Sequence, residues 1–216
     1  MISPALRAQL ESSFSRRVRE TVSTGIAALD SRTGGLPRGA ITEIYGAGSS
    51  GKTSLMLSIL AAAMMDRDEA CALVDGHDSF SPGDHNGKFL WVRCHDVTQA
   101  LKSTDLILQG GGFGLVVLDV SDLAADALQK VSLSTWFRFQ RSVEKTPTIL
   151  TIISQSGIAK TCASLVIRAA SDFAFEDRLL AHSVTVAEIV RIRSGPKASN
   201  VCCNFYPSFS SAIAHP

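Results

Sequence analysis

Apolar runs alternate with amphipathic segments along the first three quarters of the chain. Strands are predicted where apolar residues follow one another with few breaks, over residues 40–46, 70–75, 88–94, 115–119 and 148–154. Helices are predicted between them, over residues 55–65, 97–109 and 133–143. This alternation predicts an α/β fold with a mostly parallel central sheet flanked by helices.

The pattern changes towards the C-terminus. Three further strand candidates, at 164–176, 183–193 and 200–206, follow one another without long helices between them. Antiparallel strands are therefore expected on the C-terminal side of the sheet. A short helix over 23–30, capped by Ser23 or Thr24, is predicted before the first strand.

The N-terminal segment has an amphipathic pattern of its own. Apolar side chains recur there every four residues, at Leu6, Leu10, Phe14 and Val18. We expect residues 1–20 to form a short N-terminal helix that serves as a packing or oligomerisation arm, and residues 21–216 to form a single domain. The pattern does not distinguish packing on the same domain from packing on a neighbouring subunit.

The composition limits the classes of function. With 45% hydrophobic and 19% charged residues the chain can bury a sizeable core, and its net charge of +1 gives no general attraction to nucleic acid. A DNA site would have to be local or completed by oligomerisation. No apolar run is long enough to cross a membrane, so no membrane partner is expected. Five cysteines without a secretion signal favour a reducing, cytoplasmic location.

Residues 46–53, GAGSSGKT, have the spacing of a phosphate-binding loop between a strand and a helix. In such a loop backbone N–H groups surround the phosphates, the lysine approaches the β- and γ-phosphates, and the hydroxyl binds Mg²⁺. We therefore expect ATP and Mg²⁺ as cofactors, with Lys52 at the phosphates and Thr53 at the metal. The predicted nucleotide-binding residues are Gly46, Gly48, Ser49, Ser50, Gly51, Lys52, Thr53 and Ser54.

A carboxylate at the end of a neighbouring buried strand would complete the Mg²⁺ site. Asp119 ends the run LVVLD and Asp75 ends the run ALVD. Asp119 is favoured, because four aliphatic residues precede it and its distance from Lys52 suits a strand two crossovers later.

These residues carry a family resemblance. The segment STGIAALD…GGLPRGAITEIYGAGSSGKTS (23–54) resembles the core of bacterial RecA, and a looser similarity continues to the strand that ends at Gln155. The resemblance implies a RecA-like P-loop ATPase core. It also implies that Gln155 senses the γ-phosphate.

The chain departs from this family where ATP hydrolysis would be catalysed. In RecA-like recombinases, the strand after the P-loop helix leads to a glutamate that activates the attacking water. When ALVDGHDSFSP is laid on that segment, His77 takes the place of the glutamate and Asp78 is adjacent. Either could act as the base, or the chain has no efficient base. Asp84 stands near the position of the family's aromatic contact to adenine.

Other departures concern DNA and the neighbouring subunit. The region after Asp119 is acidic, and the segment after Gln155 is short, with Lys160 as its only charge. The two glycine-rich DNA loops of the family are thus largely missing. Near VRIRSGP (190–196) the family supplies cations to a neighbour's ATP, and Arg191 and Arg193 could make such trans contacts.

The departures make the chain similar to the shortened ImuA/SulA-like relatives of RecA. That similarity implies an ATP-binding accessory protein of bacterial DNA repair and SOS DNA-damage tolerance, with weak or no ATP hydrolysis, whose partner is an error-prone polymerase-like factor. One alternative is an active DNA-dependent ATPase, a recombinase that forms filaments on single-stranded DNA as a homo-oligomer. The other is a degenerate interaction module that no longer needs nucleotide.

Overall fold

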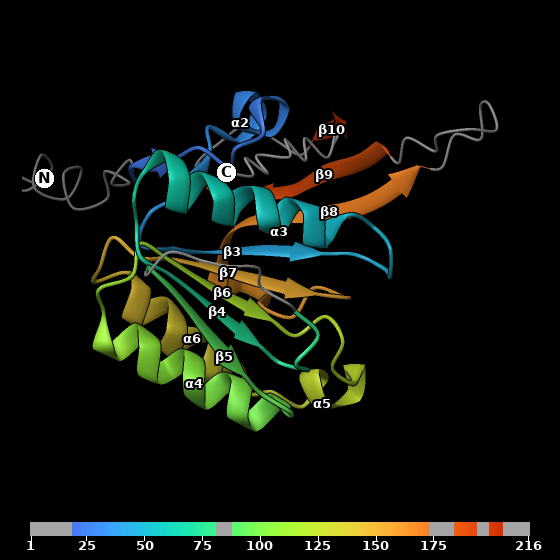
Figure 1. The fold of residues 1–216 in the computed structure, drawn as a ribbon. Coiled ribbons are helices and arrows are strands. Elements are labelled where there is room, and N and C mark those ends of the chain that lie inside the picture. Colours follow the sequence, from blue (N-terminus) through green and yellow to red (C-terminus); the bar gives the residue numbers. More distant parts are fainter. Residues whose placement is uncertain (1–18, 81–87, 173–183, 194–198, 205–216) are drawn as a thin grey trace, which may run out of the picture.

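The computed structural model describes residues 19–80, 88–172, 184–193 and 199–204 (Figure 1). The predicted N-terminal helix lies almost entirely outside these ranges, and so does Asp84. All the predicted site residues lie inside them.

The described elements alternate in the order that the apolar pattern predicts. The strands are β1 (Thr21–Val22), β2 (Leu36–Pro37), β3 (Ala40–Tyr45), β4 (Cys71–Asp75), β5 (Phe89–Arg93), β6 (Leu115–Asp119), β7 (Ile149–Ser154), β8 (Ala163–Asp172), β9 (Val184–Ile192) and β10 (Ser199–Asn204). The α-helices are α2 (Ala27–Thr33), α3 (Lys52–Ala61), α4 (Val97–Gly110), α5 (Ala125–Gln129) and α6 (Leu133–Val143). A π-helical turn, η1 (Ala62–Asp66), extends α3, and a 3₁₀ turn, η2 (Lys160–Cys162), precedes β8.

One sheet of eight strands forms the centre of the fold, in the order β10-β9-β8-β3-β7-β6-β4-β5. The strands from β8 to β5 pair in parallel, whereas β9 pairs antiparallel with both β8 and β10. The predicted fold class is therefore confirmed, including the antiparallel strands on the C-terminal side.

Helices cover both faces of the parallel part. Figure 1 shows α3 on one face and α4 and α6 on the other. Leu55 and Ile59 of α3 are fully buried on the first face, and Trp136 and Phe139 of α6 are buried on the second. In the ranges that the structure describes, no helix is long and apolar enough to cross a bilayer.

The start of the domain differs from the sequence expectation. The first helix begins at Ala27 rather than near residue 23, and its N-cap, Ile26, makes no side-chain capping bond. The proposed cap was wrong because Thr24 bonds to a carboxylate instead: its backbone N–H and its hydroxyl donate to Oδ1 of Asp30 at 2.9 and 2.7 Å. The short elements β1, β2 and α5 were not predicted.

Candidate nucleotide-binding site

The phosphate loop joins the end of β3 to the start of α3. The N–H of Gly46 donates to the carbonyl of Ser154 at 3.2 Å, so the loop begins against the end of β7. Gly51 has a φ of 84° at the N-cap of α3, and this left-handed conformation favours glycine. The N-terminus of the helix, with its partial positive charge, thereby opens onto the loop.

Lys52 lies inside the loop rather than in solvent. Its side chain is only 7% exposed, and Nζ donates to the carbonyl of Ala47 at 2.9 Å. The Ser50 hydroxyl is buried without a hydrogen-bond partner, which is unusual for a polar group in a folded protein. A lysine ammonium and an unpaired hydroxyl in one loop fit a phosphate group, which accepts hydrogen bonds from both.

Gly46 leaves no room for a side chain. A Cβ atom there would lie 2.3 Å from the carbonyl oxygen of Ala169 in β8 and 2.6 Å from Oγ of Ser50. Gly48, by contrast, faces open space, and Ser49, Thr53 and Ser54 are exposed. The loop is therefore packed at its base and open at its rim, where a nucleotide and a metal would approach.

The two candidate carboxylates lie side by side, because Asp75 and Asp119 are register partners on β4 and β6. Asp75 is 2% exposed, and its two oxygens accept hydrogen bonds from the N–H groups of His77 (3.3 Å) and Phe80 (2.8 Å). These bonds fix the turn after β4, so Asp75 has a structural task.

Asp119 is better placed to hold Mg²⁺. Its Oδ1 accepts a hydrogen bond from the N–H of Ser121 at 2.9 Å. Burial raises the pKa of this carboxyl, and the nearby Asp122 and Asp75 raise the pKa further, against the lowering effect of the Ser121 bonds. A carboxylate whose charge is disfavoured in this way gains from a bound cation.

The two candidate bases lie in the turn after β4. His77 is exposed. Asp78 is bound to the guanidinium of Arg93 through both carboxylate oxygens, and this pair lowers the pKa of Asp78. A lowered pKa makes Asp78 a weaker proton acceptor, so the turn supplies no obvious replacement for a catalytic glutamate.

Gln155 follows β7 directly. Its Nε2 donates to the carbonyl of Ser121 at 2.8 Å. The N–H of Ser121 also donates to Asp119, so the backbone of this one residue bonds to both the proposed metal ligand and the proposed phosphate sensor.

Arg191 and Arg193 contact their own chain. The guanidinium of Arg191 donates to the carbonyls of Lys160 and, at 3.0 Å, Ala163, and that of Arg193 donates to the carbonyl of Thr161. The proposed trans contacts stay a prediction, and both side chains would have to leave these carbonyls to make them.

Sequence reasoning missed Glu43. This carboxylate lies in the middle of β3 and is 2% exposed, and its Oε1 accepts hydrogen bonds from the N–H groups of Ile158 (2.5 Å) and Ala159 (2.8 Å). The signal was a single charged residue in an otherwise uncharged strand, AITEIY.

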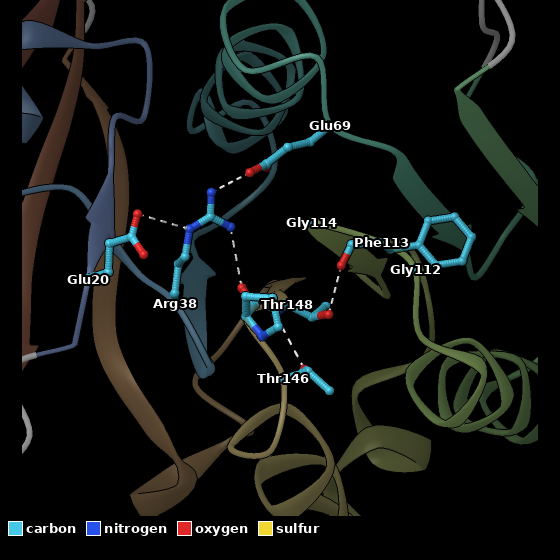
Figure 2. A pocket seen from close by; sticks show the side chains of 9 residues that line it. Glu20, Arg38, Glu69, Gly112, Phe113, Gly114, Thr146 and Thr148 are labelled. Carbon is cyan, nitrogen blue, oxygen red and sulfur yellow. Dashed lines mark hydrogen bonds and ion pairs between the residues drawn. The ribbon is translucent and has the colours of Figure 1, made fainter.

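A hollow of about 580 Å³ lies at the amino ends of β3, β6 and β7, opposite the phosphate loop, around Arg38 and residues 112–114 and 146–148. Figure 2 shows Arg38 between Glu20 and Glu69, with which it forms ion pairs. It also donates to the carbonyl of Pro147 at 3.4 Å. Because carboxylates already neutralise this guanidinium, the hollow is no alternative phosphate site.

Comparison with known proteins agrees with this geometry. The family described as the RecA N-terminal domain matches residues 8–130. The chain is 38% identical over 108 residues to Protein RecA of Ectopseudomonas oleovorans. The aligned segment covers 46% of this chain and 31% of that protein. For Protein RecA of Pseudomonas fluorescens (strain SBW25) the values are 38% over 114 residues, 48% and 32%.

The aligned segment thus spans about a third of the length of these relatives. The family match itself covers more than half of the chain and includes the phosphate loop, Asp119 and the turn after β4. The chain therefore belongs to the RecA N-terminal domain family.

Proposed function

We propose that this protein binds ATP and Mg²⁺, hydrolyses ATP slowly or not at all, and acts as an accessory factor in bacterial DNA repair and the SOS response. In its family the domain binds ATP and Mg²⁺. The observation that carries the proposal is the contrast between two neighbouring loops. The phosphate loop holds a buried Lys52 and an unpaired Ser50 hydroxyl, whereas the turn after β4 offers only His77 and an ion-paired Asp78.

The surroundings of the site support a role without extensive DNA contact. Asp122 and Asp126 are exposed in the region after β6, where negative charge would repel a phosphate backbone. The segment after Gln155 is short and bonded to Glu43, Arg191 and Arg193. Both features favour the shortened ImuA/SulA-like relatives over a filament-forming recombinase.

A protein partner is the remaining part of the proposal. Two apolar side chains of α6, Leu133 and Phe137, are 39% and 40% exposed, one helical turn apart. These two side chains are the surface of α6 that we assign to a protein partner. An error-prone polymerase-like factor is the proposed partner, in the cytoplasm. Single-stranded DNA and a second copy of the chain are the weaker candidates.

Equilibrium binding and turnover together test the proposal. We expect ATP binding that is tighter with Mg²⁺ than without, and a steady-state ATPase rate that single-stranded DNA does not raise, at low or moderate salt. Fast turnover stimulated by DNA would instead establish the recombinase. No binding at millimolar nucleotide would leave only the degenerate interaction module.

A further inference from the structure

The segment between β7 and β8, residues 155–162, is held from two sides. On one side Glu43 of β3 accepts the N–H groups of Ile158 and Ala159. On the other side Arg191 of β9 and Arg193, just after that strand, donate to carbonyls of residues 160, 161 and 163. Side chains from β3 and from the end of β9 are thus bonded to this segment and to the first residue of β8.

The Glu43 side of this arrangement is buried. Ile158 is 5% exposed and Ala159 is fully buried. Without Glu43 their N–H groups would therefore lose their acceptor, and water could not replace it. Burial raises the pKa of Glu43, while the two N–H bonds and the charge of Arg191 lower it. The attraction between Glu43 and Arg191 therefore links the two sides of the arrangement.

Gln155 lies between two residues whose backbone groups are hydrogen-bonded to other parts of the sheet. One residue before it, Ser154 accepts the N–H of Gly46 from the phosphate loop. Three residues after it, Ile158 is bonded to Glu43. The Gln155 side chain meanwhile donates to Ser121. Its backbone is restrained on both sides, so its side chain can exchange one acceptor for another while the segment stays in place.

We propose that Glu43 is a positioning residue: by holding residues 158–159 it fixes Gln155 next to the phosphate loop and thereby sets the preference of the site for ATP over ADP. The inference rests on the proposed nucleotide binding. In the nucleotide-free protein the Gln155 amide bonds to Ser121, and a γ-phosphate offers it a charged acceptor instead. ADP offers no such acceptor, so only ATP affinity depends on where Gln155 is held.

The test is a double-mutant cycle on the full chain, with Mg²⁺–ATP and Mg²⁺–ADP titrated by calorimetry. Glu43→Met keeps the length of the side chain and removes the acceptor, while Glu43→Gln keeps an oxygen that can accept both N–H groups. We expect Glu43→Met to lower the ATP-to-ADP affinity ratio at least about fivefold with ADP affinity unchanged, and Glu43→Gln to restore the ratio. In a Gln155→Leu background, Glu43→Met should have no further effect on the ratio.

Each other result has a definite meaning. An equal loss of ATP and ADP affinity, or a full additional effect in the Gln155→Leu background, would show that Glu43 only supports the fold and would overturn the inference. If Glu43→Met does not fold by circular dichroism, Arg191→Gln releases the same segment from its exposed side and must lower the ratio in the same direction. A wild-type protein that binds neither nucleotide refutes the proposed function, whereas one that binds both with a ratio insensitive to these variants refutes the role of Glu43 alone.

Discussion

The loops that follow β3 and β4 leave strands of the same sheet but differ in the functional groups that they carry. After β3, a glycine with no room for a side chain, a buried lysine and the N-terminus of α3 converge on one loop. After β4, Asp75 is used to fix the turn and Asp78 is bound to Arg93. Binding a phosphate and activating a water molecule are therefore separable tasks, because they depend on the loops after two different strands.

Lys52→Ala should give the largest effect, since it removes the one buried cation of the first loop. We expect nucleotide affinity to fall about 100-fold or more, the scale of charge-assisted contacts to phosphate. Calorimetric titration of ATP measures it. Lys102→Ala, at an exposed lysine of α4, is the matched control and should bind normally. Unchanged affinity in Lys52→Ala would show that the loop after β3 does not bind the nucleotide phosphates.

His77→Glu tests the turn after β4 by placing a carboxylate where RecA-like recombinases have one. We expect ATP turnover to rise about 30-fold. This is less than the roughly 10²–10⁴-fold rate increase from a well-positioned general base, because the new carboxylate would lack side chains that orient it. Lys102→Glu, at an exposed position of α4, adds a carboxylate outside the turn after β4 and is the control. A flat response in His77→Glu would show that the missing carboxylate is not what limits turnover.

Asp119→Asn and Asp75→Asn separate the two adjacent carboxylates. Asp119→Asn should weaken ATP binding about tenfold in the presence of Mg²⁺ and leave it unchanged in EDTA, because the lost group is a metal ligand. Asp75→Asn should instead lower the free energy of unfolding by about 1–2 kcal/mol, since one of two N–H groups loses its acceptor. The opposite outcome would exchange their roles.

The smallest effect is the pH dependence of Asp119→Asn without nucleotide. The pKa of Asp119 is raised above its ordinary value of 3.8, so the folded state holds this proton more tightly than the unfolded state does. Stability from this group is therefore present below that value and is lost as pH rises through the raised pKa. At pH 7 the Asn variant should be more stable by about 1 kcal/mol, and urea unfolding at about pH 3, below the ordinary value, should show no difference.

The sequence predicts the parts of this structure that depend on long apolar patterns. The bounds predicted for the α6 helix agree with the structure, and the run LVVLD is β6. The phosphate loop was predictable because eight consecutive residues carry its chemistry. Features that depend on specific pairings were not: β1 pairs with β2 on the far side of helix α2, and Thr24 bonds to the carboxylate of Asp30. For the same reason the role of Glu43 was not predicted, because its partners lie more than a hundred residues away.

The close contact at Gly46 determines how far the protein can be shortened. The family match ends at residue 130, but the atom that forbids a side chain at Gly46 belongs to Ala169 in β8. The base of the phosphate loop is thus built by a strand that follows the matched segment. A fragment that ended at residue 130 would keep the phosphate loop and Asp119 but lose β7 and β8, against which the base of the loop is packed. Strand β8 is therefore part of the base of the phosphate loop, although it lies outside the matched segment.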